Sequence, residues 1–207
     1  MKNKSIIFVF DLGRVLLNID PIKCYECFLS LGISKEYESR LKELFQEYES
    51  GQLHESQLLD IVNEETNSSY DYEAFWCCWD QMIIGFIPEM IDRLERLKED
   101  YTCVLLSNTN SRHQKVFEEL FMNTFGYPMS EAFDALFYSH QMSCSKPSSE
   151  IYHMVENKIK VDNSRFYFFD DLKDNLNSAN GLGWNIYHVT PDVTATLEYI
   201  ELLIQEF

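Results

Sequence analysis

The sequence predicts an α/β fold in which helices cover both faces of a parallel sheet. Four short apolar runs each end abruptly at a polar residue, and such unbroken runs are typical of strands that are buried on both faces. Helical patterns lie between these runs, and this alternation of strand with helix favours a Rossmann-like parallel sheet. Several amphipathic helices in succession follow the first run, and they predict a small helical-bundle cap inserted into the core.

The core elements can be assigned one by one from the apolar pattern. Pro88 fits the first turn of a helix and precedes apolar residues at helical spacing, and a second such pattern follows Ser111. Three further helices are predicted over residues 148–157, 174–182 and 193–205. The predicted strands cover residues 6–10, 102–106, 135–138, 165–169 and 185–189.

Residues 18–85 form the predicted cap, and residues 1–17 and 86–207 form the predicted core. The block contains no convincing strand. A small cap over a sheet implies opening and closing about two linkers, near Leu17 and near Gly85. Two sets of apolar residues in the block recur at the spacing of one helix face, namely Tyr37, Leu41, Leu44, Phe45 and Tyr48, and then Tyr72, Phe75, Trp76, Trp79 and Ile83.

Composition excludes several classes of partner. The chain has 34 Asp and Glu residues against 17 Lys and Arg, which gives a formal net charge of −17. A surface this acidic repels nucleic acids and anionic membranes, so neither is a predicted partner. The apolar runs are far shorter than the roughly 20 residues that span a bilayer, and no signal-peptide pattern is present. A cytoplasmic protein is therefore expected, and nothing in the sequence indicates an oligomeric state.

The six cysteines are expected to be reduced thiols, because a chain of this size with its own core needs no disulfides. Cys24 and Cys27 have the spacing of a redox pair or half a zinc site. No second Cys or His pair follows at metal-site spacing, so packing or surface placement is the favoured interpretation. Cys77 and Cys78 are expected to lie in an apolar helix core.

Polar side chains stand where the predicted strands end, and ligands of parallel sheets bind at that edge. Alone, each residue type is common in turns and helix caps. Together they combine a carboxylate nucleophile or metal ligand, a hydroxyl donor, a cation and a second carboxylate pair. In chain order these residues are Asp11, Ser107 with Asn108, Lys146, and Asp170 with Asp171.

This ordered set resembles the haloacid dehalogenase-like hydrolase superfamily. The motifs are most similar to the branch that contains α-D-glucose-1-phosphate phosphatase, in which a glycine also stands two residues after the first Asp. The helical insertion looks like the small cap of that branch. The residues that carry the resemblance are 10–16 (FDLGRVL), 106–110 (LSNTN), 145–147 (SKP) and 168–171 (FFDD), with Asn175.

The resemblance implies a phosphatase in which Asp11 attacks phosphorus and forms an aspartyl phosphate. It also implies Mg²⁺ as cofactor, held by the carboxylates of Asp11 and Asp170 and by the main-chain carbonyl of Gly13. The implied supporting groups of the metal are Asp171 and Asn175. Binding of the transferring phosphoryl group is assigned to Lys146, Ser107 and Asn108.

Gly13 departs from the common family pattern, in which many phosphatases carry a second Asp that acts as general acid and base. An anomeric hydroxyl is more acidic than an ordinary alcohol, so a sugar 1-phosphate would suffer less from the missing acid. The small cap over the site predicts a small phosphorylated metabolite as substrate, and the missing acid points to a sugar phosphate within that class.

Two other functions fit parts of the sequence. A 2-haloacid dehalogenase uses the same Asp nucleophile and expels a halide without protonation, but it has no use for the Asp170–Asp171 pair. A non-catalytic binding protein of the same fold is favoured only by the missing acid. Arg14 and His113 are candidate substrate contacts. The alternatives are an ion pair with acidic residues of the cap for Arg14 and an ordinary helix-start residue for His113.

Overall fold

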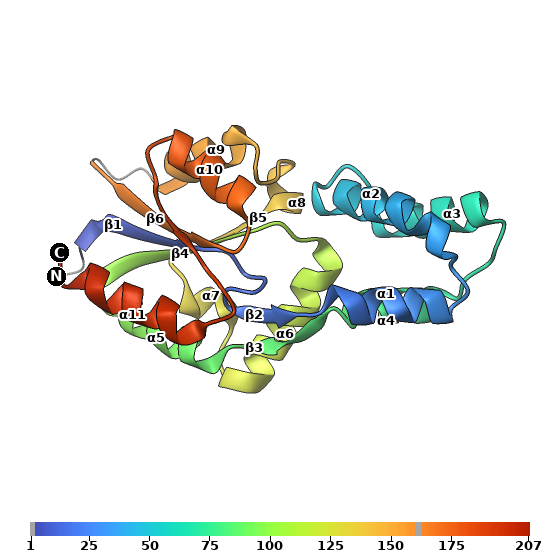
Figure 1. Cartoon of the computed structure of the whole chain (residues 1–207), viewed down its shortest axis with the longest axis horizontal. Coiled ribbons are helices and arrows are strands. Elements are labelled where there is room, and N and C mark those ends of the chain that lie inside the picture. The colour runs from blue at the N-terminus through green and yellow to red at the C-terminus, as the bar shows by residue number, and fades with distance from the viewer. Residues whose placement is uncertain (1–2, 160–162) are drawn as a thin grey trace.

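Five parallel strands form the central sheet of the computed structural model, which describes residues 3–159 and 163–207 (Figure 1). The strand order is β5-β4-β1-β6-β7, and every neighbouring pair is parallel. The predicted Rossmann-like α/β fold is therefore confirmed. The strands are β1 (Asn3–Phe10), β4 (Tyr101–Ser107), β5 (Ala135–Tyr138), β6 (Arg165–Asp170) and β7 (Asn185–His188).

Both faces of β1 are buried, which explains its unbroken apolar run. Ile6, Phe8 and Phe10 belong to one apolar cluster, whereas Ile7 and Val9 belong to another on the opposite face. Figure 1 shows helices on both sides of the sheet. The first cluster is completed by α5 (Pro88–Asp100), α6 (Ser111–Phe125) and α11 (Val193–Ile204), and the second by α9 (Ser149–Ile159) and α10 (Lys173–Gly181).

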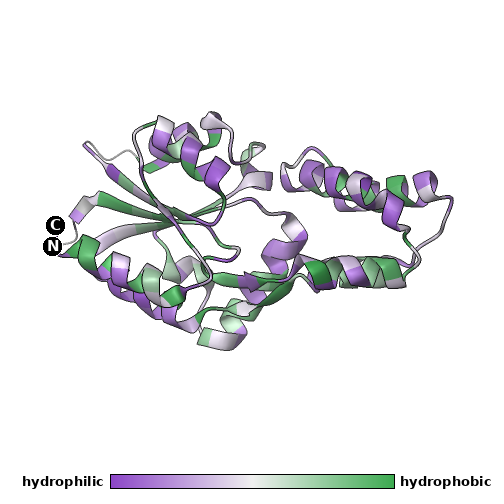
Figure 2. Ribbon diagram, viewed as in Figure 1, coloured by the Kyte–Doolittle hydropathy of each residue, from purple (hydrophilic) through white to green (hydrophobic). Residues whose placement is uncertain are grey.

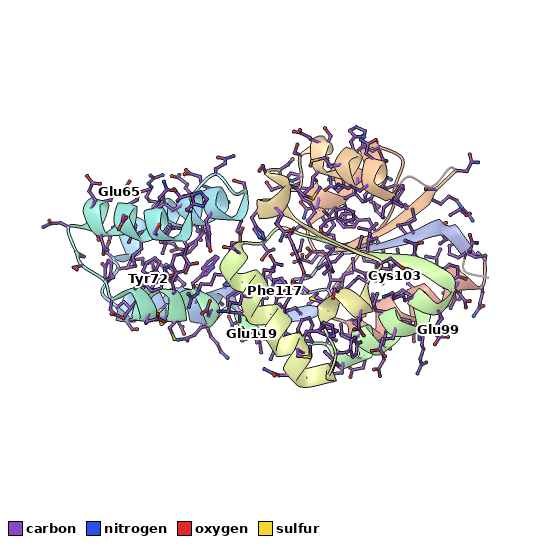
Figure 3. All side chains as sticks on the ribbon, turned by 180° about the vertical axis from the view of Figure 1, so that it is seen from behind. Glu65, Tyr72, Glu99, Cys103, Phe117 and Glu119 are labelled. Atoms are coloured by element: carbon purple, nitrogen blue, oxygen red, sulfur yellow. A yellow bond between two sulfur atoms is a disulfide. The ribbon has the colours of Figure 1, made fainter. Side chains whose placement is uncertain are left out.

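Between residues 21 and 80, all of which the structure describes, four α-helices pack around an apolar core of their own. Side chains of their two layers meet between them (Figure 3). This cap core includes Phe28, Phe45 and Phe75, with Trp76 and Trp79 beside them. The helices are α1 (Pro21–Ser30), α2 (Glu38–Glu49), α3 (Glu55–Thr66) and α4 (Tyr72–Asp80), and the 3-10 turn η1 (Lys35–Tyr37) precedes α2.

Two short strands join the cap to the core, so the prediction that residues 18–85 contain no strand is wrong. β2 (Leu17–Ile19) pairs antiparallel with β3 (Ile83–Phe86). Helix α4 ends at Asp80, and Ile83 belongs to β3 rather than to the predicted helix. Strands this short show no clear alternation of apolar and polar residues, and the two strands lie far apart in the sequence. The sequence pattern therefore does not reveal them. We place the boundary between core and cap at this ribbon.

A disulfide between Cys27 and Cys78 links α1 to α4, so the prediction that all six cysteines are reduced is wrong. Cys77 is exposed rather than buried in the helix core, whereas Cys78 is buried. The bonded residues are 51 positions apart, and only the packing of α1 on α4 brings them together. Such bonds are rare in a reducing cytoplasm, and the cytoplasmic location stays a prediction.

Hydropathy separates the inside of the molecule from its surface. Figure 2 shows hydrophobic colour concentrated on the central strands, while the helices of the cap and core alternate between hydrophobic and hydrophilic residues. Across residues 3–159 and 163–207, no helix combines the length and the apolar character that crossing a membrane requires.

Candidate active site

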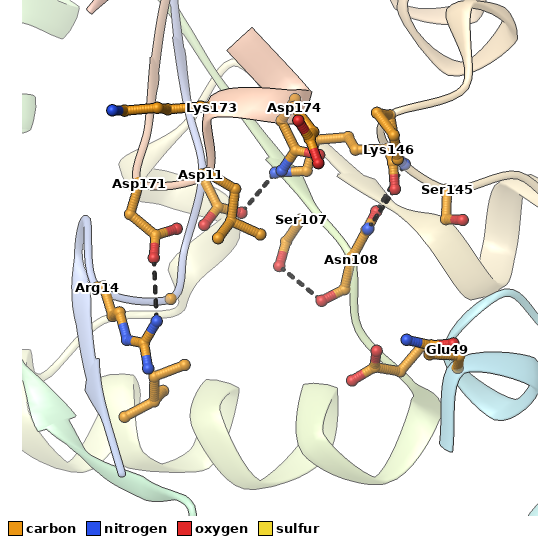
Figure 4. A pocket seen from close by; sticks show the side chains of 16 residues that line it. Asp11, Arg14, Glu49, Ser107, Asn108, Ser145, Lys146, Asp171, Lys173 and Asp174 are labelled. Atoms are coloured by element: carbon orange, nitrogen blue, oxygen red, sulfur yellow. Dashed lines mark hydrogen bonds and ion pairs between the residues drawn. The ribbon is translucent and has the colours of Figure 1, made fainter. Parts of the chain in front are cut away.

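A cavity of about 710 Å³ opens at the carboxyl ends of the core strands, beneath the end of cap helix α2 (Figure 4). The strand order puts β1 at the centre of the sheet, between β4 and β6. The residues that end these strands therefore converge on one point. Predicted site residues that line the cavity are Asp11, Gly13, Arg14, Ser107, Asn108, Lys146, Asp171 and Asn175.

Asp11 and Asp170 lie beside each other because their strands are hydrogen-bonded neighbours. Phe10 is in register with Phe169, and the Asp11 amide donates to the Phe169 carbonyl over 2.9 Å. Each Asp therefore follows directly on a buried pair of the ladder. Asp170 is fully buried and Asp11 nearly so. Two carboxylates at such depth need compensating charge.

Lys146 supplies that charge. Its Nζ lies 2.6 Å from Asp11 Oδ1 and 2.8 Å from Asp170 Oδ2, and its side chain is only 1% exposed. Burial alone would lower the pKa of Lys146, but the two carboxylates outweigh burial and raise this pKa. For Asp11, burial raises the pKa above its ordinary value, and the Lys146 ammonium opposes that effect. The ion pair between Lys146 and Asp11 thus keeps a cation next to the carboxylate at the end of β1.

Asn108 holds the backbone of Lys146 through two reciprocal hydrogen bonds. Asn108 Nδ2 donates to the Lys146 carbonyl over 2.8 Å, and the Lys146 amide donates to Asn108 Oδ1 over 2.9 Å. The Asn108 side chain is therefore occupied in positioning Lys146, whereas the predicted binding of phosphate by the amides near Asn108 stays a prediction. Ser107 is 3% exposed and lines the cavity, where its hydroxyl donates to the Asn108 carbonyl over 3.4 Å.

The carboxylates of Asp11, Asp170 and Asp171 form a possible metal site, since each offers an oxygen and these oxygens lie within 4.8 Å of one another. Asn175 Nδ2 donates to both oxygens of Asp170 over 3.1 Å, and the Leu172 amide donates to Oδ1 over 2.8 Å. These bonds orient Asp170. An all-oxygen donor set of this kind suits a hard divalent cation such as Mg²⁺.

Gly13 contributes no side chain to the cavity. Ile19, a residue of the linker between core and cap, lies close to the position that a Cβ of residue 13 would occupy. A Cβ at Gly13 would lie 3.1 Å from Cδ1 of Ile19 in β2. Ile19 itself lines the cavity. The position at which many family members carry a carboxyl group is thus bordered here by an apolar side chain.

Arg14 lines the cavity but pairs with the core rather than with acidic residues of the cap. Its Nη1 lies 3.3 Å from Asp171 Oδ2, and the Arg14 side chain is 51% exposed. Burial and the neighbouring Asp170 raise the pKa of Asp171, and Arg14 opposes this shift. At half exposure, an ion pair of this kind contributes at most about 1 kcal/mol. Arg14 is therefore available to contact a ligand at the mouth of the cavity.

His113 does not line the cavity. It is 6% exposed, its ring stacks on Trp79 of α4 at a centroid distance of 4.5 Å, and Nε2 lies 3.1 Å from the Trp79 carbonyl. The structure therefore places His113 at the contact between core helix α6 and the cap. Arg112 reinforces this contact through an ion pair with Asp80 at 2.7 Å.

Protonation of His113 is expected to weaken the folded state in mild acid. Burial lowers the pKa of His113 from 6.5 to about 4, so between these values the unfolded chain binds the proton more readily. Stability should therefore fall as the pH drops through this window, by up to about 1.4 kcal/mol per pH unit. Urea unfolding of the wild type and of His113→Gln from pH 4.5 to 7 measures this slope. The exposed His153→Gln serves as control, and an unchanged slope in His113→Gln would contradict the assignment.

Sequence reasoning missed residues of both the cap and the core that line the cavity. Gln46 and Glu49 of α2 line the cavity, as do Lys173 and Asp174 at the start of α10. Gln46 and Glu49 are three residues apart and so share one helix face. The sequence pattern identifies this helix by its apolar face, and it gives no sign that its polar residues line a site. Which end of that helix meets the core is decided by packing, not by its periodicity.

The amino-acid sequence is similar to a known protein family and to a named phosphatase. The sequence profile of the haloacid dehalogenase-like hydrolases matches residues 8–183. A D-ribitol-5-phosphate phosphatase of Bacteroides thetaiotaomicron is 28% identical over 192 residues, which cover 86% of this chain and 89% of that protein.

Solved structures show the same architecture. A HAD-family enzyme of Bacteroides thetaiotaomicron, in complex with magnesium and inorganic phosphate, is 27% identical with a TM-score of 0.80, covering 90% of this chain and 94% of that one. L-2-haloacid dehalogenase from Xanthobacter autotrophicus is 14% identical with a TM-score of 0.60, covering 90% of this chain and 77% of that one. The second likeness concerns the fold alone.

Proposed function

This chain belongs to the haloacid dehalogenase-like hydrolase family, and we propose that it is a Mg²⁺-dependent phosphatase acting on a small phosphorylated sugar or polyol. The observation that carries the proposal is the buried arrangement of Lys146 between Asp11 and Asp170, with Asp171 close by. The similarity to a D-ribitol-5-phosphate phosphatase and to an enzyme crystallised with magnesium and phosphate supports it.

The proposed reaction has two steps. A carboxylate oxygen of Asp11 attacks phosphorus, the bond to the substrate oxygen breaks, and water then hydrolyses the aspartyl phosphate to release phosphate. Lys146 and the Ser107 hydroxyl, which line the cavity with Asp11, bind the phosphoryl oxygens. Asp11, Asp170 and the Gly13 carbonyl would hold Mg²⁺, which supplies the positive charge that lets an anionic carboxylate meet a phosphate dianion.

Dehalogenation is the second candidate, because Asp11 could also displace a halide. The cluster of Asp170 and Asp171 beside Asp11 favours the phosphatase, since halide displacement needs no divalent cation. Release of chloride from 2-chloropropionate, at a rate that a chelator leaves unchanged, would favour the dehalogenase instead.

The range of substrates is expected to be narrower than phosphate monoesters in general, because Gln46 and Glu49 of the cap line the cavity. The motif resemblance favours a sugar 1-phosphate, whereas the relative named above is a D-ribitol-5-phosphate phosphatase. A panel containing glucose 1-phosphate, glucose 6-phosphate and ribitol 5-phosphate separates these classes. Equal turnover of the two glucose phosphates would contradict a preference for the anomeric ester.

Removal of the metal is expected to abolish turnover of p-nitrophenyl phosphate. Without a divalent cation, the cluster of Asp11, Asp170 and Asp171 repels the phosphate dianion, and Lys146 alone does not neutralise it. Initial rates measured with Mg²⁺ and with excess chelator test this, and re-addition of Mg²⁺ should restore the rate. Nitrophenolate leaves without protonation, so the assay does not depend on a general acid. Turnover that is the same with chelator as with Mg²⁺ would contradict the proposal.

A further inference from the structure

The leaving group of an alkyl phosphate needs a proton, and the usual donor is missing at Gly13. Expelling an alkoxide is far harder than expelling an alcohol, and general acid catalysis typically contributes about 10²- to 10⁴-fold. The space next to Gly13 is bordered by Ile19, which cannot donate. If the enzyme hydrolyses alkyl phosphates, another group in the cavity must deliver this proton.

Glu49 is placed to do so. It lies at the last position of α2 and lines the cavity together with Asp11 and Ser107 (Figure 4). Figure 4 shows its carboxyl group directed from the cap helix into the pocket. Within residues 3–159 and 163–207, its side chain makes no hydrogen bond or ion pair. Its proton is therefore not engaged by another residue.

The backbone around Glu49 is held firmly against the core. The Ser139 hydroxyl donates to the Glu49 carbonyl over 2.5 Å, and the Tyr48 and Ser111 hydroxyl oxygens lie 3.2 Å apart. Gly51 has a φ of +74°, and a Cβ there would lie only 2.7 Å from the His140 carbonyl oxygen. A glycine thus permits the close approach that seats the end of α2 on the core.

The surroundings of Glu49 also favour its protonated form. Burial and the negative charge of Asp11 raise the pKa of Glu49 to about 8, so a large fraction carries a proton at neutral pH. Two other carboxylates of the cavity are less suitable donors. Asp171 is paired with Arg14, and Asp11 is the nucleophile of the proposed reaction.

We propose that Glu49 is the general acid and base of this enzyme, replacing from the cap the carboxyl group that Gly13 lacks in the core. This inference rests on the proposed phosphatase function. As Asp11 bonds to phosphorus and the bond to the leaving oxygen breaks, the Glu49 proton passes to that oxygen and an alcohol departs. Glu49 is now a carboxylate and takes a proton from the water that attacks phosphorus. Cleavage of the bond to Asp11 then releases phosphate and regenerates both side chains.

The role of Glu49 predicts a loss that depends on the leaving group. In Glu49→Gln, kcat/KM for ribitol 5-phosphate should fall about 10²- to 10³-fold, because an alkoxide must leave unprotonated. For p-nitrophenyl phosphate, kcat/KM should change less than about threefold, because nitrophenolate is a stable anion. This parameter covers only the steps up to departure of the leaving group, so the later hydrolysis step does not enter. The alkyl phosphate that the wild type turns over fastest replaces ribitol 5-phosphate if that ester is a poor substrate.

Glu47→Gln is the matched control, since it makes the same change on the same helix at a side chain that does not line the cavity. It should leave kcat/KM unchanged for both esters, and thermal unfolding should show that both variants are folded. Equal losses of Glu49→Gln on the two esters, or no loss on either, would overturn the role of Glu49 and leave the phosphatase intact. Absence of wild-type turnover on both esters would overturn the proposed function and the role of Glu49 with it.

Discussion

Asp11→Asn should abolish phosphatase turnover, lowering kcat by about 10⁴-fold or more. Asparagine has nearly the same shape as aspartate, but its neutral amide neither attacks phosphorus nor ligates a divalent cation strongly. Lys146 would keep its contact with Asp170 at 2.8 Å, so the variant should remain folded. Acid-quenched wild-type enzyme should carry one phosphoryl group on the peptide that contains Asp11, and the variant should carry none.

Asp60→Asn provides the control for this experiment. Asp60 is an exposed residue of α3, so the same chemical change there should leave both turnover and peptide labelling as in the wild type. A phosphoryl group found on another residue of the wild type would refute Asp11 as the nucleophile. Full turnover in Asp11→Asn would refute the covalent route altogether.

Lys146→Met should damage both catalysis and the stability of the metal-free protein. The ammonium is the buried partner of Asp11 and Asp170, and removing one member of a buried ionic group leaves uncompensated charge that costs about 3–5 kcal/mol. The lost stabilisation of the phosphoryl oxygens should lower kcat/KM by about 10²- to 10³-fold. Because Asp11 and Asp170 are also the proposed ligands of Mg²⁺, the cation should stabilise the variant against urea more than it stabilises the wild type.

The matched control is Lys42→Met, which removes a lysine that also pairs with a carboxylate but is exposed. Lys42 lies 2.6 Å from Glu38 and is 69% exposed, so its loss should cost no more than about 0.5 kcal/mol. Urea unfolding with chelator and with Mg²⁺, together with initial rates, gives all the required values. If Lys146→Met unfolds at the same urea concentration as Lys42→Met, the buried ion pairs do not support the fold as inferred.

The core elements could be predicted because their signals are local. In β1, five consecutive apolar residues are buried between two layers of helices, and burial on both faces leaves a pattern that needs no knowledge of the partners. The end of that run at Asp11 also marks the edge of the sheet where ligands bind. The five strands of the sheet, and the polar residues that follow them, could therefore be predicted from the sequence.

Other features could not be predicted because they depend on contacts between distant segments. Cys27 and Cys78 carry no spacing that marks them as a pair, and β2 and β3 are too short to show strand alternation. His113 follows the Ser107 motif closely, yet its ring stacks on Trp79 of the cap and does not line the cavity. In each case a cap helix or linker supplies the partner.

The sequence by itself determined the α/β fold and the chemical character of the core site, because strand burial and the residues at strand ends are written within short segments. Tertiary structure alone decided that Lys146 reaches both Asp11 and Asp170, that Asn108 holds its backbone, and that Glu49 enters from the cap. The physical reason is that Lys146 and Asn108 are placed by the packing of distant core segments around the sheet, whereas Glu49 is placed by the packing of the cap on the core. Packing of this kind depends on many weak contacts between segments that are distant in the sequence, and a local sequence pattern does not show which of these segments meet.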